Sequence, residues 1–182
     1  MITNSGDTMM DYSARLLVAL TLGCIGLLTS ANASEAQNAP ARAITVVGGA
    51  FQYDLSGTGT TGFGGLRLEF PFNRYVLVEP AFTYAQYTPQ GGGNAVRMFF
   101  PEAQLQFALP LGRVRPFVGL GLGRGIFRNG DRSSSETWGS VGGGARFRLS
   151  ELVGMRAELR VRANERLTAS AAELTLGVSR GL

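Results

Sequence analysis

Hydrophobic and polar residues alternate with a period of two along most of this chain, from Ala43 onward. The clearest run has Met155, Ala157, Leu159, Val161 and Ala163 on one face and Arg156, Glu158, Arg160 and Arg162 on the other. A β-strand places successive side chains on opposite faces, whereas a helix repeats about every 3.6 residues. The alternation therefore predicts an all-β protein and argues against amphipathic helices.

Eight alternating stretches can be counted between turn-rich breaks. They span residues 44–55, 62–72, 75–87, 96–109, 113–128, 137–149, 152–164 and 170–181. Most are longer than the roughly 5 to 6 residues usual in soluble proteins, and they match the roughly 9 to 11 residues of a tilted transmembrane strand. A soluble lipocalin-like barrel would also alternate, so the period alone leaves both classes open.

The breaks between stretches differ in length in a regular way. Those after even stretches are short, at residues 73–74, 110–112 and 150–151, and those after odd stretches are longer and more polar, at residues 56–61, 88–95, 129–136 and 164–169. Outer-membrane barrels combine short periplasmic turns with longer external loops. We therefore predict an eight-stranded antiparallel up-and-down transmembrane β-barrel, with both chain ends in the periplasm.

An export signal at the N-terminus supports the membrane alternative. The apolar run at residues 16–28 follows Arg15 and precedes Ala31-Asn32-Ala33, an A-x-A cleavage pattern. We predict a signal peptide at residues 1–33, with Met9 and Met10 as alternative starts, a short periplasmic segment at 34–42 and the barrel at 43–182. A lipoprotein site at Cys24 and an uncleaved anchor helix are the alternatives.

The side-chain inventory excludes most catalytic and metal chemistry. The chain has no His, and its 17 basic residues are all Arg, so neither imidazole nor lysine amine is present. Its single Cys, Cys24, lies in the predicted signal peptide. We therefore expect no cofactor, no metal site and no enzymatic activity. Nucleic-acid binding is also not expected, because the net charge of +4 is small and the arginines are dispersed along the chain.

Two segments resemble a known family. Residues 115–123 (RPFVGLGLG) and 154–160 (GMRAELR) resemble strands of the small outer-membrane β-barrel domain family, of the OmpA and OmpX type. The resemblance covers about residues 43–182 and implies insertion by the barrel-assembly machinery. Barrels of this family usually end in an aromatic residue that the machinery reads, whereas this chain ends in Leu182.

The polar face of the stretches carries charges of both signs. Seven arginines and five glutamates share it: Arg67, Arg115, Arg146, Arg148, Arg156, Arg160, Arg162, Glu69, Glu79, Glu102, Glu158 and Glu173. Buried charges are costly alone, so we predict a lumen plugged by ion pairs, including Arg160 with Glu173 across the last hairpin. Glycines on the same face (Gly119, Gly121, Gly123, Gly142, Gly144) should make room for these long side chains.

Three arginines break the rule that the lipid-facing positions are apolar. The turn at residues 110–112 places Arg97 opposite Ile126, with Arg124 and Arg128 as its diagonal neighbours. These arginines either extend into water or hold lipopolysaccharide phosphates at the headgroup level. A second register prediction concerns the third and fourth stretches, where Pro80 is expected opposite Pro101.

Together these observations predict a monomeric bacterial outer-membrane protein in contact with membrane lipids and lipopolysaccharide. We expect a structural or surface-interaction role in the cell envelope. A narrow channel for small solutes and a soluble exported lipocalin-like binding barrel remain the alternatives.

Overall fold

The computed structural model describes residues 42–54, 59–88, 94–167 and 169–182. The predicted signal peptide, and the predicted 34–42 segment apart from Arg42, lie outside the described residues. Within the described ranges, no helix is long and apolar enough to cross a membrane.

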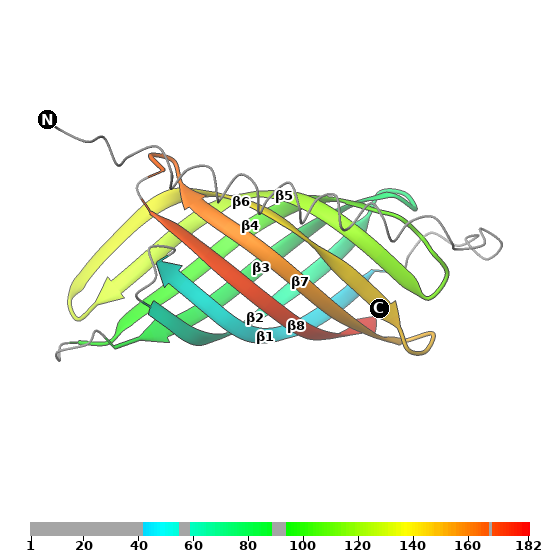
Figure 1. The fold of residues 1–182 in the computed structure, drawn as a ribbon, viewed down its shortest axis with the longest axis horizontal. Helices are drawn as coiled ribbons and strands as arrows, with labels where there is room; N and C mark the ends of the chain where they lie inside the picture. The colour runs from blue at the N-terminus through cyan, green and yellow to red at the C-terminus, as the bar shows by residue number, and fades with distance from the viewer. Residues whose placement is uncertain (1–41, 55–58, 89–93, 168) are drawn as a thin grey trace, which may run out of the picture. The chain divides into compact units, whose positions relative to one another are not determined.

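Eight antiparallel strands form one closed barrel, in which each strand pairs with its neighbours in sequence and β1 pairs with β8 (Figure 1). The strands are β1 (Ala43–Asp54), β2 (Gly59–Pro71), β3 (Val76–Tyr87), β4 (Val96–Ala108), β5 (Val114–Asn129), β6 (Arg132–Arg148), β7 (Val153–Asn164) and β8 (Ser170–Gly181). The predicted all-β, eight-stranded, up-and-down barrel is confirmed.

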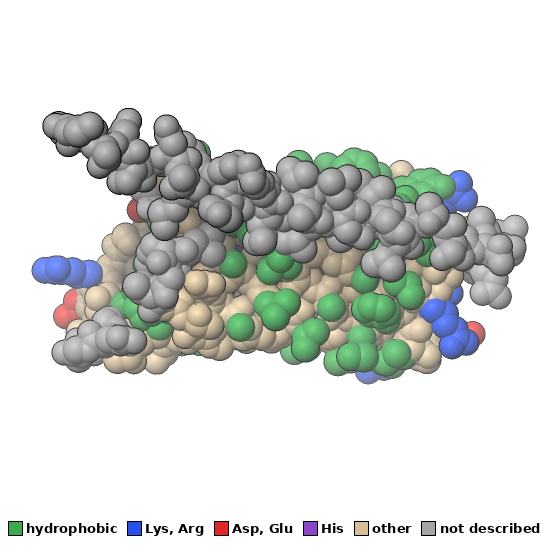
Figure 2. All heavy atoms as spheres, in the orientation of Figure 1, with side chains coloured by type: hydrophobic (Ala, Val, Ile, Leu, Met, Phe, Trp, Pro, Cys, Tyr) green, Lys and Arg blue, Asp and Glu red, His purple; other side chains and the backbone are tan. Residues whose placement is uncertain are grey.

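The alternating sequence separates an apolar outer surface from a polar interior. Large hydrophobic side chains such as Leu120, Leu122 and Leu176 are more than 60% exposed, whereas Arg67, Arg160 and Glu173 are completely buried. Hydrophobic side chains are spread over the visible barrel face between its ends, and charged ones lie at the two ends (Figure 2). A soluble lipocalin-like barrel would have its apolar face inside, so this arrangement excludes that alternative.

The connections divide the barrel into two ends (Figure 1). We call the end with the β1–β2, β3–β4, β5–β6 and β7–β8 connections the loop end, and the end with the C-terminus and the other three connections the turn end. The turn-end connections are compact. Asn73 Oδ1 accepts the backbone N–H groups of Tyr75 (2.8 Å) and Val76 (2.9 Å), and Ser150 Oγ accepts that of Val153 (3.1 Å).

One predicted loop is wrong. Residues 129–136 were expected to form a long connection, but β6 begins at Arg132, which pairs with Asn129. The remaining two residues form a tight turn, with Gly130 at φ 56° as its first central residue. The polar run at residues 133–135 misled the prediction, because a strand end with both faces in water does not need to alternate. The structure also begins β2 at Gly59, three residues before the predicted start.

Two predicted registers are each displaced by two residues. Arg97 faces Arg128, and Ile126 faces Phe99 instead of Arg97. This register follows from a tight β4–β5 turn, in which Leu111 and Val114 exchange backbone hydrogen bonds of 3.0 and 3.1 Å. In the β3–β4 hairpin, Pro80 faces Ala103 and Pro101 faces Phe82, so the two prolines are not opposite each other.

Candidate functional site

The half of the lumen nearer the turn end contains a group of ion pairs that we call the lumen network. Its members are five arginines and five glutamates: Arg67, Arg146, Arg156, Arg160, Arg162, Glu69, Glu79, Glu102, Glu158 and Glu173. They come from β2, β3, β4, β6, β7 and β8. The two signs are equal in number, so the network as a whole carries no net charge.

Glu79 lies at the centre of the lumen network and is completely buried. Its carboxylate accepts hydrogen bonds from both terminal nitrogens of Arg156, and the distance from Nη2 to Oε1 is 3.0 Å. Arg146 Nη2 approaches its Oε2 at 3.2 Å, and Arg160 Nη2 approaches its Oε1 at 3.5 Å. One carboxylate therefore accepts hydrogen bonds from three arginines, and Arg67 Nε lies 4.0 Å from its Oε1. Forked contacts such as that of Arg156 are the strongest that Arg makes.

Glu173 has other partners than the one predicted. The register does place it opposite Arg160. Its carboxylate, however, binds Arg67 Nη2 at 2.6 Å and also Arg162. Arg160 instead binds Glu158 at 2.8 Å, and it also binds Glu102. The prediction of this pair was wrong because a guanidinium on a long stem reaches across the lumen, so register alone does not decide its partner.

Arg115 and Arg148 do not belong to the lumen network, which corrects their predicted assignment. Arg115 Nη2 donates to the backbone oxygen of Arg74 at 2.6 Å, and Arg148 is exposed and lies 3.4 Å from the oxygen of Gly112. Both residues are near the turn end of their strands. Arg115 is half-buried and Arg148 is exposed, because the polar face passes from the lumen into water there. The sequence pattern does not mark where the lumen stops.

Uncharged groups add to the coordination of the arginines. Thr83 Oγ1 accepts from Arg67 at 3.0 Å, and Gln104 Oε1 accepts from Arg160 at 3.2 Å. The ring of Phe117 lies 4.2 Å from the guanidinium carbon of Arg146 and 4.7 Å from that of Arg156. An aromatic face attracts a cation, so this ring supports two arginines at once.

The glycine-rich wall of β5 and β6 leaves the space that the network occupies. A Cβ atom at Gly119 would lie 2.8 Å from the Gln104 side chain, and one at Gly142 would lie 3.1 Å from Glu158 Oε1. At Gly144 a Cβ would clash with the backbone oxygen of Ala157. Gly119 and Gly142 thus lie against long polar side chains, as the sequence pattern suggested, whereas Gly144 lies against the backbone of the neighbouring strand.

The half of the lumen nearer the loop end is filled differently, by what we call the aromatic layer. It consists of Phe51, Phe63, Phe100 and Trp138, with Val47, Ala85, Val96, Met98 and Ala171, and with Tyr53, Tyr87 and Phe127 packed against them. Phe100 is central, because its ring centroid lies 5.4 Å from that of Phe51 and 5.5 Å from that of Trp138. The two halves meet where the guanidinium of Arg162 lies 5.3 Å from the Phe100 ring.

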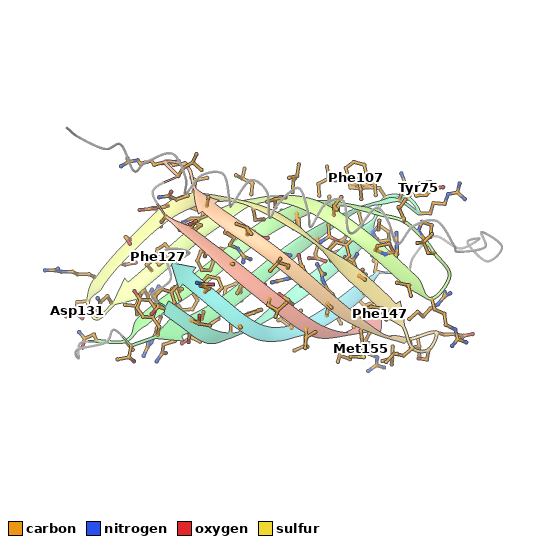
Figure 3. The ribbon with its side chains drawn as sticks, viewed as in Figure 1. Tyr75, Phe107, Phe127, Asp131, Phe147 and Met155 are labelled. Atoms are coloured by element: carbon orange, nitrogen blue, oxygen red, sulfur yellow. The ribbon has the colours of Figure 1, made fainter. Side chains whose placement is uncertain are left out.

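The aromatic layer was not predicted from the sequence, although a signal for it is present. Phe100 has the same parity as Glu102, and Phe63 has the same parity as Arg67, so both had to point inward. Charged residues mark only one half of the inward face, and apolar residues of the same parity fill the other half. Figure 3 shows Phe127 near the loop end, with Phe107, Phe147 and Met155 toward the turn end.

The three outer arginines lie at the loop end of β4 and β5, and all are exposed. Arg97 and Arg128 are direct cross-strand neighbours. The guanidinium of Arg128 lies 5.7 Å from the ring of Phe99, and Arg124 donates to Ser135 Oγ at 3.2 Å. Like charges placed directly opposite destabilise a sheet unless an anion lies between them.

In the described part of the chain, no group of three or more acidic, thiol or imidazole side chains could hold a metal ion.

The sequence matches the family described as "Outer membrane protein beta-barrel domain" over residues 20–180. The chain therefore belongs to this family of bacterial outer-membrane barrels.

Solved structures show the same fold. Neisserial surface protein A has a TM-score of 0.64 at 14% identity, with 80% of this chain and 100% of that chain covered. The N-terminal β-barrel domain of Pseudomonas aeruginosa OprF has a TM-score of 0.55 at 17% identity, with 80% and 100% covered. Ail of Yersinia pestis has a TM-score of 0.53 at 15% identity, with 79% and 99% covered. A comparison with curated protein sequences gives no match.

Proposed function

We propose that this protein is a structural barrel of the bacterial outer membrane whose lumen is sealed. The observation that carries the proposal is the filling of the interior in two successive layers, a neutral lumen network and an aromatic layer. An eight-stranded barrel is only wide enough for its own side chains to fill, so both layers can close it. The narrow channel remains the competing function.

Planar lipid bilayers test the seal. We expect no stepwise conductance after insertion of the purified, refolded barrel. Glu79→Ala combined with Phe100→Ala shortens one central side chain in each layer and should raise the frequency of opening events. Steps in the unmodified protein would overturn the seal and favour the channel. A shift in gel mobility between unboiled and boiled samples reports insertion-competent folding in both proteins.

We also propose that the turn end faces the periplasm and that the barrel is a monomer inserted by the barrel-assembly machinery. Short turns at this end and longer external loops are the usual arrangement in such barrels. Cysteines introduced at Asp131→Cys and Ser150→Cys test the orientation, since both positions are exposed and lie at opposite ends. A membrane-impermeant thiol reagent applied to intact cells should label the first, and labelling of the second would reverse the orientation.

A second candidate function concerns Arg97, Arg124 and Arg128, which we propose contact lipopolysaccharide phosphates. The supporting observation is the direct pairing of Arg97 with Arg128 beside the outward-facing rings of Phe99 and Tyr84. Guanidinium groups bind phosphate in a forked geometry, and aromatic rings favour the membrane interface.

Exchange of all three arginines for Gln should reduce the lipopolysaccharide that co-purifies with the barrel. Arg74→Gln/Arg113→Gln/Arg148→Gln removes the same number of exposed arginines at the other end and serves as the control. If the loop-end variant retains as much lipopolysaccharide as the control, these three arginines only extend into water.

A further inference from the structure

Among the described residues, the excess of exposed positive charge is larger at one end of the barrel than at the other. The lumen network contributes nothing to it, because its five arginines match its five glutamates. The exposed arginines at the turn end are Arg42, Arg74, Arg113, Arg148 and Arg180. Glu151 is the only exposed acidic side chain among the described residues there. We call these five arginines the basic rim.

The loop end is much more balanced. Its five exposed arginines (Arg97, Arg124, Arg128, Arg132, Arg166) share the surface with exposed Asp131, Glu136 and Glu165. Among the described residues, no ion pair joins an arginine of the basic rim to a carboxylate. The rim therefore presents cationic groups that no acidic side chain of the described protein neutralises.

Aromatic and aliphatic side chains surround the basic rim. Phe72, Leu149 and Leu152 lie in the turns themselves and are 59 to 73% exposed. Tyr75, Phe107 and Phe147 are exposed at the same end (Figure 3). Aromatic residues with flanking arginines mark the level of lipid headgroups, where one part of the surface contacts acyl chains and the other contacts phosphates.

The backbone holds several rim arginines in defined places. Arg74 is in the turn fixed by Asn73, and its guanidinium carbon lies 4.6 Å from the Tyr75 ring centroid. Arg42 lies 5.9 Å from the Phe70 ring. The backbone N–H of Arg148 donates to the oxygen of Arg113 at 2.8 Å, which ties the β4–β5 turn to the end of β6. These contacts restrict the positions of the rim arginines, and such restriction lowers the entropy lost when a ligand binds.

We propose that the basic rim binds the phosphates of anionic phospholipids in the periplasmic leaflet of the outer membrane. Guanidinium groups match phosphate oxygens geometrically, and unpaired positive charge selects anionic over zwitterionic headgroups. The exposed side chains of Phe72, Leu149 and Leu152 fit the same occupant, because they would lie among the first acyl carbons. The choice of leaflet rests on the orientation proposed above, whereas binding itself does not.

Lipid retention by the purified, refolded barrel tests the proposal. The protein is mixed in micelles with equal amounts of phosphatidylglycerol and phosphatidylcholine, re-isolated, and its bound lipids are quantified by mass spectrometry. We expect phosphatidylglycerol to be enriched. Arg74→Gln/Arg113→Gln/Arg148→Gln should reduce this enrichment at least about fivefold, since a basic residue near an anionic surface contributes roughly 1 kcal/mol.

A matched control removes two exposed arginines from the loop end that lie outside the proposed lipopolysaccharide site, Arg132→Gln/Arg166→Gln; it is compared with the double rim variant Arg113→Gln/Arg180→Gln and should retain the enrichment. Equal loss in both variants, or no loss in either, would overturn the proposal. If the first variant does not fold, as judged by gel mobility, Arg113→Gln/Arg180→Gln replaces it. The unmodified barrel and the rim variant are also sedimented with purified peptidoglycan. If only the unmodified barrel co-sediments, the cell wall is the occupant of the rim and the proposal is overturned.

Discussion

The two halves of the lumen differ in how their side chains depend on one another. In the lumen network, Glu79 binds three arginines, and removal of its charge would leave several buried cations underneutralised. In the aromatic layer, Phe100 contacts Phe51, Phe127 and Trp138 through many weak and undirected contacts. A buried ion pair is therefore specific but intolerant of single changes, whereas an apolar layer can partly repack around them.

The largest expected effect is that of Glu79→Gln, which keeps the shape of the side chain and removes its charge. We expect a loss of about 3 to 5 kcal/mol in the free energy of unfolding, the usual consequence of breaking a buried pair on one side. Denaturant titration in micelles, followed by the fluorescence of Trp138, the only tryptophan, measures it. Glu151→Gln, which is exposed, is the control and should leave the midpoint unchanged.

Phe100→Ala is the corresponding change in the aromatic layer. We expect the free energy of unfolding to fall by about 3 kcal/mol. This value is at the lower end of the range for Phe→Ala in a core, because the partly buried Phe127 can move into the space. The unfolding midpoint measures it, and Phe82→Ala on the outer face is the control. A larger loss for Phe100→Ala than for Glu79→Gln would reverse the order of sensitivity inferred for the two halves.

A smaller effect is expected in the glycine wall, where the space available decides the outcome. Gly144→Ala should destabilise the barrel by about 1 to 3 kcal/mol, because the new Cβ meets the backbone of Ala157. Gly139→Ala lies on the outer face of the same strand, with nothing within 4 Å of the new atom, and should be close to neutral. Similar unfolding midpoints for the two variants would show that the lumen is looser than the contacts indicate.

The smallest expected effect concerns the one aromatic ring inside the lumen network. Phe117→Leu keeps most of the apolar volume and removes the ring face beneath Arg146 and Arg156, which should lower stability by about 1 kcal/mol. Phe107→Leu on the outer surface is the control. If the two variants unfold alike, Phe117 acts only as apolar filling, and the contrast between the two halves does not extend to their aromatic residues.

The sequence predicted the strands better than the connections between them. Alternation has a strong physical basis, because lipid on one side and a packed lumen on the other constrain each successive residue. Beyond the membrane this constraint ends, and for that reason the start of β6 at Arg132 was missed. The registers of Pro80 and Arg97 were each displaced by two residues, an error that preserves parity and leaves the assignment of faces correct.

The candidate site was predictable in composition and not in connectivity. Ten of the twelve proposed lumen charges lie in the network, because parity assigns them to the interior. The partner of Glu173 could not be read from the strands, since Arg67, which binds it, is 106 residues away in the chain. The exclusion of Arg115 and Arg148 likewise depends on how far each strand extends past the lumen.

The sequence by itself determined which residues face the lipid and which face the lumen, because a strand with a period of two leaves each side chain only one choice. It also determined that the interior charges nearly balance. Tertiary structure decided which guanidinium meets which carboxylate, since closure of the barrel brings together side chains from six strands. It also decided that charge fills one half of the lumen and aromatic rings the other, because only the closed register aligns the strands along the barrel axis.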